Sequence, residues 1–352
     1  MSLIDIKSMT TEEILEMLKT MGQPKFRASQ IFSWLHSGVS SFDEMTNIPK
    51  ALREELSKRC YIANVQIKKK LVSQLDGTVK YLYKLHDGEY IESVLMSYNH
   101  GYTVCISTQV GCRMGCKFCA SGINGLVRDL TASEMLSQIK MAELDNNIRV
   151  SNVVMMGMGE PLDNFDNSVR FLRLVSDDNG MNVGLRHISL STSGVVTGIK
   201  RLSEENLPIT LSISLHAPFD DMRSNVMPVN KKWNIKALLN ACHEYQKVTG
   251  RRISFEYAMI KDVNDSKECA DALIKLLRGL LCHVNLIPAN PVVENNFKRS
   301  DEQNVKSFCD YLNKNGINTT VRRTLGADIN ASCGQLRRQS VRGNECENCK
   351  QI

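Results

Sequence analysis

Three cysteines lie close together in the segment 111–119, which reads Gly-Cys-Arg-Met-Gly-Cys-Lys-Phe-Cys. The C-x3-C-x2-C spacing offers three thiolates, at Cys112, Cys116 and Cys119. A cubane iron–sulfur cluster normally has one cysteine thiolate for each of its four irons, so a triplet leaves one iron open. An open iron can bind the amine and carboxylate of S-adenosylmethionine. The spacing therefore predicts a [4Fe-4S] cluster and radical chemistry with that cofactor.

Disulfides and zinc are the other uses of closely spaced cysteines. Cysteines packed this closely cannot all be bridged to one another, and intracellular chains seldom use disulfides as structure. A three-thiolate zinc site completed by Cys105 or a distant histidine is the rival interpretation. Zinc modules usually present two C-x2-C pairs, whereas here a single pair is extended by an x3 step. The spacing favours the cluster over zinc.

Short polar motifs follow β-rich segments in the second half of the chain, at 157–161, 189–194, 212–217 and 287–291. The first contains Gly159 and Glu160, where glycine lets the backbone approach a ligand and the carboxylate can accept hydrogen bonds from an ammonium group. Alone, this motif is typical of a tight turn, and His216 in the third motif is typical of a structural histidine. Beside a cluster triplet, the motifs together favour a site for a nucleoside and amino-acid ligand.

Six β-rich segments alternate with helical ones from residue 103 onward, which is typical of an α/β fold with a parallel sheet. They are 103–108, 152–157, 187–192, 209–215, 253–260 and 283–288. Such a series predicts a partial (β/α)6 barrel, a TIM-like barrel that is open on one side and would admit a large substrate. Ligands of these folds gather where the strands end, and the polar motifs lie there.

Two smaller regions precede the predicted barrel. Thr10 and Glu13 form a capping-box pattern before a helix, and further helical patterns begin near residues 25 and 49. Apolar and polar residues alternate between 65 and 96, with Asp76-Gly77 as a hairpin turn. We expect an N-terminal helical domain at 1–62, a β extension at 63–100, the barrel at 101–325, and a C-terminal catalytic-cysteine loop and tail at 326–352. The helical domain is either a stabilising cap or an RNA-binding module.

The composition is that of an ordinary globular protein, with 42% hydrophobic and 23% charged residues. The 44 lysines and arginines outnumber the 38 acidic residues, and the formal net charge of +6 fits a nucleic-acid partner without requiring one. No signal peptide or membrane-spanning apolar run is evident, so we expect a cytoplasmic protein with no membrane partner. Cys242, Cys269, Cys282 and Cys309 fall in expected helices or strands and are interpreted as inert, packed thiols.

The chain resembles the dual-specificity radical S-adenosylmethionine methyltransferases, which modify C2 of an adenosine in 23S rRNA, in the peptidyl transferase centre, and of adenosine 37 in certain tRNAs. The resemblance covers almost the whole length. It is carried by 25–28, 34–35, 109–119, 157–161, 214–217, 255–257, 285–291 and 328–336. It implies a [4Fe-4S] cluster, two S-adenosylmethionine molecules per turnover, rRNA and tRNA substrates, and an electron donor such as flavodoxin or ferredoxin.

The resemblance also implies roles for individual residues. Cys112, Cys116 and Cys119 would hold the cluster. Cys333 would carry the methyl group, Cys105 would be a second reactive cysteine, and Glu92 would be the proton acceptor. The S-adenosylmethionine site would comprise Gly159, Glu160, Ser191, Ser214, Leu215, His216 and Asn290. Without the resemblance, Cys105 in its strand would be a core thiol. Cys346 and Cys349 form a C-x2-C pair in the tail, to which the resemblance assigns no role.

Adenine C2 is an electron-poor carbon and S-adenosylmethionine is an electrophile, so direct polar methyl transfer should fail. The resemblance implies that one S-adenosylmethionine methylates the Cys333 thiolate, while the reduced cluster cleaves a second to a 5′-deoxyadenosyl radical. That radical takes a hydrogen from the S-methyl group, and the resulting carbon radical adds to C2 to form a protein–RNA crosslink. Loss of the C2 proton, helped by Cys105 or Glu92, and attack of Cys105 on the Cys333 sulfur would release the methylated base. A transient disulfide bond would remain, which cellular thiols reduce.

Two alternatives remain open. An antibiotic-resistance methyltransferase of the Cfr type acts at C8 of the same ribosomal adenosine with the same cluster and carrier cysteine. The segment 159–162 with the nearby Asn164 favours the C2 enzyme. A non-catalytic zinc or iron–sulfur protein that binds RNA would show no cleavage of S-adenosylmethionine.

Overall fold

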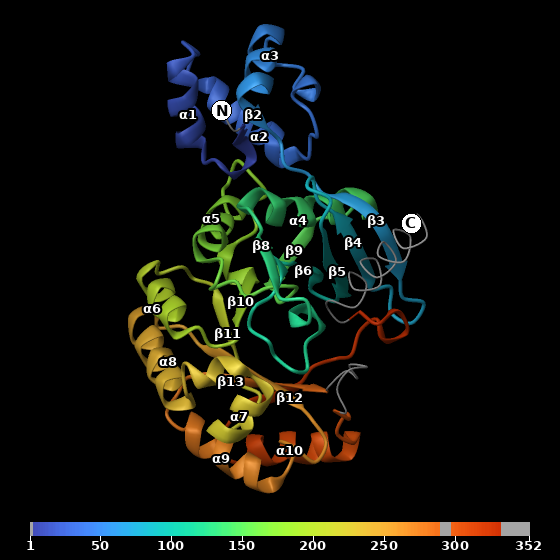
Figure 1. The fold of residues 1–352 in the computed structure, drawn as a ribbon, viewed down its shortest axis with the longest axis vertical. Coiled ribbons are helices and arrows are strands. Elements are labelled where there is room, and N and C mark those ends of the chain that lie inside the picture. The colour runs from blue at the N-terminus through green and yellow to red at the C-terminus, as the bar shows by residue number, and fades with distance from the viewer. Residues whose placement is uncertain (1–2, 289–296, 332–352) are drawn as a thin grey trace, which may run out of the picture.

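The computed structural model describes residues 3–288 and 297–331. Within these residues the chain forms a ten-stranded sheet with the order β14-β13-β12-β11-β10-β9-β6-β5-β4-β3 (Figure 1). Neighbouring strands from β14 to β6 pair in parallel. They are β6 (Gly101–Cys105), β9 (Val150–Met155), β10 (Ile188–Thr192), β11 (Thr210–Ser214), β12 (Ile253–Met259), β13 (Cys282–Pro288) and β14 (Thr319–Val321).

The helices that connect these strands cover the outer face of the curved sheet. Figure 1 shows α5, α6, α8, α9 and α10 in an arc outside the strands. The helices are α4 (Ala132–Asn146), α5 (Phe165–Val175), α6 (Val196–Glu204), α7 (Asp220–Val226), α8 (Ile235–Thr249), α9 (Lys267–Leu277) and α10 (Glu302–Lys314). The predicted α/β partial barrel is confirmed, and the six expected β-rich segments coincide with β6 and β9 to β13. β14 was not expected, because its three residues are too few to show a period.

Alternating side chains give the barrel an apolar outer face and a polar inner face. In β10, Ile188 and Leu190 are buried in the core, while Ser189 and Ser191 point the other way. β11 repeats this pattern, and Ser189 lies 2.9 Å from Ser212 through their hydroxyl oxygens. The helices therefore pack on isoleucine and leucine, and small hydroxyl groups remain inside for a polar ligand.

Residues 3–62 fold mainly as helices at one end of the molecule (Figure 1). They contain α1 (Thr11–Thr20), α2 (Phe26–Ser37) and α3 (Lys50–Arg59), and a short parallel pair of β1 (Ile4–Asp5) and β2 (Cys60–Tyr61). The predicted capping box is confirmed, because the Thr10 amide donates to the Glu13 carboxylate at 2.8 Å and the Glu13 amide donates to Thr10 Oγ1 at 3.3 Å.

The segment that follows adds antiparallel strands to the sheet edge. β3 (Gln66–Val72), β4 (Val79–Lys84) and β5 (Tyr90–Tyr98) pair in succession, and β5 pairs with β6. The predicted hairpin is confirmed, with Gly77 in its turn at a φ of +72°. The β extension is therefore continuous with the barrel sheet. No helix among the described residues is long and apolar enough to cross a membrane.

Candidate active site

Two short strands close the loop that carries the cysteine triplet. β7 (Gln109–Gly111) and β8 (Leu126–Asp129) pair in antiparallel fashion, and the loop between them contains the 3-10 turn η3 (Ala120–Gly122). The Cys112 amide donates to the Gly125 carbonyl at 2.9 Å. The loop is thus fixed at its base, and its thiols lie beyond the end of β6.

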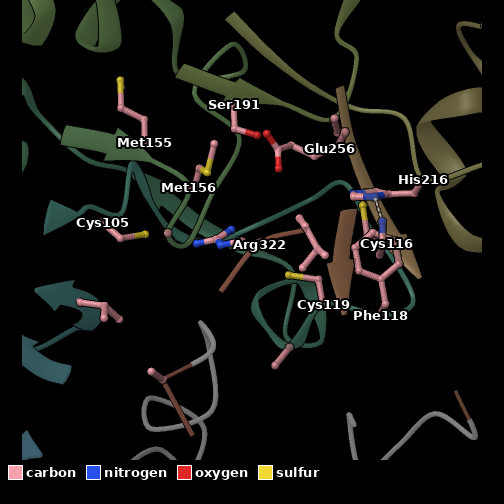
Figure 2. A pocket seen from close by; sticks show the side chains of 18 of the residues that line it. Cys105, Cys116, Phe118, Cys119, Met155, Met156, Ser191, His216, Glu256 and Arg322 are labelled. Carbon is pink, nitrogen blue, oxygen red and sulfur yellow. Dashed lines mark hydrogen bonds between the residues drawn. The ribbon is translucent and has the colours of Figure 1, made fainter. Parts of the chain in front are cut away.

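The loop borders a cavity of about 370 Å³ at the carboxyl ends of the parallel strands (Figure 2). This volume lies in the range of small-molecule sites in proteins. The predicted site residues that line it are Cys105, Cys112, Cys116, Cys119, Gly159, Glu160, Ser191, Ser214 and His216. The structure brings these residues from separate segments of the chain to one space, as the positions of the polar motifs led us to expect.

Among the described site residues, Leu215 and Glu92 do not line the cavity. The Leu215 side chain is fully buried in the core next to it, and its amide donates to the Glu256 carbonyl at 3.1 Å. Glu92 is buried in the antiparallel extension, where it pairs with Lys80. Asn290, Cys333, Cys346 and Cys349 lie outside the described residues.

His216 is held in one orientation at the end of β11. Its φ of 55° lies in the left-handed region, which is uncommon for residues other than glycine. Its Nδ1 accepts a hydrogen bond from the Ala258 amide at 2.9 Å, and its ring packs edge-on against Phe118 with centroids 4.7 Å apart. Burial, assisted by the charge of Arg223, lowers the pKa of His216 to about 3. The neutral ring therefore carries its proton on Nε2 and suits ligand positioning better than proton transfer.

Glu160 is enclosed by backbone amides. Its carboxylate accepts hydrogen bonds from the Ser193 amide at 2.6 Å and the Leu162 amide at 3.1 Å. Burial raises the pKa of Glu160, and the hydrogen bonds to Ser193 oppose that shift. An ammonium group bound beside this carboxylate would stabilise its charged form.

The glycines of the 157–161 motif are required by contact between two loops. A Cβ on Gly159, whose φ is +104°, would lie 2.6 Å from the Gln109 Cβ, and a Cβ on Gly157 would lie 2.5 Å from the Ile106 carbonyl oxygen. The sequence led us to expect that these glycines admit a ligand to the backbone. The structure adds that they also admit the chain that leaves β6.

Glu256, Arg322 and Arg323 also line the cavity, and none of them was among the predicted site residues. Glu256 in β12 accepts hydrogen bonds from Asn285 at 2.8 Å and from the Ser254 hydroxyl at 3.0 Å. Burial raises the pKa of Glu256, and the charge of Arg322 opposes the shift. Figure 2 shows Arg322 reaching into the space between Cys105 and Cys119. Two signals for Glu256 were available: a carboxylate inside a largely apolar strand, and its place in the segment 255–257 that carries the family resemblance.

Arg223 joins the ends of two barrel strands and was also missed. Its side chain is fully buried, and its guanidinium donates to the carbonyls of Ser193 at 2.7 Å, Ser214 at 3.0 Å and Leu215 at 3.0 Å. Burial lowers the pKa of Arg223 to about 10, so the group is charged at neutral pH. Arg223 therefore holds in place the strand ends from which the predicted ligand residues project.

The triplet fits an iron–sulfur cluster by the chemistry of its donors. Burial raises the pKa of Cys112 to about 12, and the pKa of Cys116 is raised by burial and by the neighbouring Cys119 and Cys112 thiolates. Burial thus disfavours the charged thiolate, and metal coordination would offset this effect because it stabilises the thiolate form. In the part of the chain that the structure describes, no three histidine, cysteine, aspartate or glutamate side chains converge as a single-ion site. In a cubane each thiolate binds a different iron, so the ligands surround the whole cluster and do not converge on a single ion.

Cys105 lies at the opposite side of the cavity from the triplet. It packs with Val94 and Met96, and the later residues Leu325 and Ala331 cover this small apolar cluster. Figure 2 shows its thiol directed toward the cavity. The described chain thus returns to Cys105 two residues before the predicted methyl carrier, Cys333.

Comparisons with known proteins agree with this arrangement. Residues 106–277 match the model of the radical SAM superfamily, and residues 4–62 match that of the ribosomal RNA large subunit methyltransferase N-terminal domain. A protein of Alkaliphilus oremlandii named "Probable dual-specificity RNA methyltransferase RlmN" is 54% identical to this chain. The match covers 97% of this chain and 99% of that protein. A Clostridium novyi protein of the same name is 49% identical, also over 97% and 99%.

A solved structure has the same fold over nearly the whole chain. The crystal structure of a radical SAM methyltransferase from Sphaerobacter thermophilus superposes with a TM-score of 0.89 at 43% sequence identity. The match covers 94% of this chain and 98% of that one. The chain belongs to the RlmN family of dual-specificity RNA methyltransferases, within the radical SAM superfamily.

Proposed function

We propose that this enzyme methylates C2 of an adenosine in the peptidyl transferase centre of 23S rRNA and C2 of adenosine 37 in certain tRNAs. The proposal includes a methyl-Cys333 intermediate and a transient protein–RNA crosslink. Its relatives of the RlmN family, named as dual-specificity RNA methyltransferases, support an RNA substrate.

One observation carries the proposal. A single cavity is lined by the cysteine triplet, by the strand-end residues expected to bind S-adenosylmethionine, by Cys105, and by Ala331 near the C-terminal cysteine. A methyl carrier, a resolving thiol and a radical source must work on the same base. Residues that meet in one enclosed space satisfy that requirement.

Cys112, Cys116 and Cys119 would hold the [4Fe-4S] cluster. Together with S-adenosylmethionine, the bound cluster would supply the radical that removes a hydrogen atom from the methyl group on Cys333. Glu160 would bind the ammonium of S-adenosylmethionine, and His216 would donate a hydrogen bond through Nε2. Ser191, Ser214 and Asn290 would complete that site, with Leu215 and Gly159 contributing backbone.

Cys105 would attack the Cys333 sulfur and free the methylated base. Its placement supports this role, since it lines the cavity beside Ala331. Glu92 would accept the proton from C2. The β5–β6 register places Val94 opposite Cys105, and Glu92, two residues earlier on β5, points to the same face of the sheet. A flavodoxin or ferredoxin in the cytoplasm would supply electrons to the cluster.

The N-terminal helical domain would help to bind RNA. Its match to the ribosomal RNA large subunit methyltransferase N-terminal domain supports this assignment over a purely stabilising cap. An adenine inside folded RNA must also be unstacked before it can enter an enclosed cavity. We assign binding of the surrounding RNA to this domain and the methylation reaction to the barrel.

Anaerobic reconstitution followed by product analysis tests the function. We expect iron and sulfide in the purified protein, 5′-deoxyadenosine after addition of a reductant, and a methyl group at C2 of rRNA and tRNA from a deficient host. Cys116→Ala should lose the cluster, whereas Cys282→Ala, a thiol in β13, should keep it. Methylation at C8 alone would assign the enzyme to the Cfr type. Stoichiometric zinc without cofactor cleavage would indicate a binding protein.

A further inference from the structure

We propose that the turn of the β3–β4 hairpin and Lys80 form a clamp that holds the segment 326–331 and thereby positions Cys333 beside Cys105. The role of Cys333 rests on the proposed function, whereas the contacts of the clamp all lie within the described residues. Lys80 and Asp328 are positioning residues here, since they act through the segment that they hold.

The hairpin turn binds the segment from two sides. The Asp328 carboxylate accepts hydrogen bonds from the Ser73 hydroxyl at 2.6 Å and from the Gln74 amide at 2.8 Å. In return, the Gly326 amide donates to the Asp76 carboxylate at 2.8 Å. Figure 1 shows the segment, in red, beside the tip of the hairpin. These three hydrogen bonds join parts of the chain about 250 residues apart. Each has a carboxylate as its acceptor, which makes it stronger than a hydrogen bond between neutral groups.

The segment is also closed on itself. The Gly326 carbonyl accepts hydrogen bonds from the Ile329 amide at 3.2 Å and the Ala331 amide at 3.1 Å. Gly326 has a φ of +60°, and a Cβ there would lie 2.6 Å from the Ala331 Cβ and 3.1 Å from the Thr78 Cγ2. A glycine is therefore needed for both the turn and its contact with the hairpin.

Lys80 links the segment to the strand that carries Glu92. Lys80 pairs with Val94 across β4 and β5, and Val94 pairs with Cys105 across β5 and β6, so the three side chains stand in one row. The Lys80 ammonium donates to the Asn330 carbonyl at 2.9 Å and pairs with the Glu92 carboxylate at 3.0 Å. Both charged side chains are almost completely buried, so their geometry is fixed.

These contacts fix the point from which the chain continues toward Cys333. Ala331 packs against the cluster that contains Cys105, and two residues of chain span at most about 7 Å. A clamped segment would therefore keep the Cys333 thiol within reach of the Cys105 thiol. Fixing two groups in this way raises their effective concentration, which favours the attack of one sulfur on the other.

The effective concentration of the two thiols can be measured in a glutathione redox buffer with the full-length, reconstituted enzyme under anaerobic conditions. Oxidised glutathione accepts two electrons from the thiol pair, giving the Cys105–Cys333 disulfide and two molecules of reduced glutathione. Peptide mass spectrometry measures the fraction oxidised. Because Asp328 accepts charge-assisted hydrogen bonds, Asp328→Ala should lower the equilibrium constant at least about tenfold. Asp310→Ala, an exposed carboxylate on α10, should change it less than about twofold.

Lys80→Met and Lys84→Met form a second matched pair on β4. Lys84 is exposed, so only Lys80→Met should weaken the disulfide, and thermal unfolding shows whether each variant is folded. An Asp328→Ala enzyme with the wild-type equilibrium constant would overturn the clamp, as would a wild-type enzyme that forms no Cys105–Cys333 disulfide. If the Asp328 effect is found but no RNA is methylated, the clamp stands and the proposed function fails.

Discussion

At the scale of single residues, the two reactive cysteines differ in their surroundings. Cys105 is buried in a strand between Val94 and Met96, whereas Cys333 follows a segment that the hairpin holds. Under the proposed mechanism the methyl carrier forms the bond to RNA and the strand cysteine breaks it. Removing either thiol should therefore stop the reaction at a different point.

Cys105→Ala should accumulate a covalent protein–RNA species, because the attack that resolves the crosslink is lost. Cys333→Ala should form no such species, since no methyl group is carried. Denaturing electrophoresis with radiolabelled RNA distinguishes the two, and Cys309→Ala, a half-buried thiol on α10, serves as the control. A crosslink in Cys333→Ala would exclude this cysteine as the carrier.

His36 is a buried residue that should make the fold sensitive to acid. Neither ring nitrogen has a hydrogen-bond partner among the described residues, and burial, with the charges of Lys7 and Lys140, lowers its pKa from 6.5 to about 3. Below pH 6.5 this histidine therefore binds a proton in the unfolded chain but not in the folded chain. The free energy of unfolding falls as the pH drops toward 3.

His36→Phe should remove this part of the acid sensitivity. One pH unit below 6.5 the histidine costs about 1.4 kcal/mol of unfolding free energy, and the phenylalanine variant should not show that loss. Urea unfolding at pH 7.0 and pH 5.5 measures the difference, with His100→Phe as an exposed control. Equal pH dependence in wild type and His36→Phe would refute the assignment.

At the scale of elements, the strands could be predicted and their side-chain partners could not. The period of Ile188, Leu190 and the intervening serines marks a strand, and the alternation around Asp76-Gly77 marks a hairpin. Cys105 was assigned through family resemblance alone, because a strand cysteine is usually a packed thiol.

The missed residues act through partners on other elements of the fold. Arg223 contacts carbonyls at the ends of two different strands, and Asp328 contacts the turn of the β3–β4 hairpin. A local pattern of residue types does not predict such contacts. Glu256 was missed for a related reason, since its environment depends on Asn285 in the neighbouring strand and on Arg322, which follows β14.

Arg223→Met should destabilise the barrel by about 2 kcal/mol or more. The substitution removes the guanidinium donor from the carbonyls of Ser193 and Ser214 in a buried site, and each loss costs about 1 kcal/mol or more. The Leu215 carbonyl keeps a hydrogen bond from the Ala217 amide at 2.7 Å. Chemical denaturation measures the loss, and Arg278→Met, at an exposed position after α9, should have little effect. A loss below about 1 kcal/mol would mean that other groups hold the strand ends.

At the scale of the whole molecule, the arginines that line the cavity are candidates for contact with RNA phosphates. The net charge of +6 is modest for a chain of 352 residues. Arg322 and Arg323 both line the cavity, and Arg323 is exposed. The cavity thus has cationic groups at the boundary with solvent, while its interior carries thiols and hydroxyl groups.

Arg323→Ala should weaken RNA binding uniformly across substrate sequences if this arginine contacts a phosphate. Each phosphate contact releases about one counterion, so the slope of log affinity against log salt concentration should become shallower by about 0.7–1. Binding titrations at several salt concentrations measure the slope. Lys306→Ala removes an exposed positive charge from α10 and should leave the slope unchanged. If both variants made the slope equally shallow, RNA binding would depend on overall charge and not on the mouth of the cavity. A local phosphate contact at Arg323 would instead make its effect larger than that of Lys306.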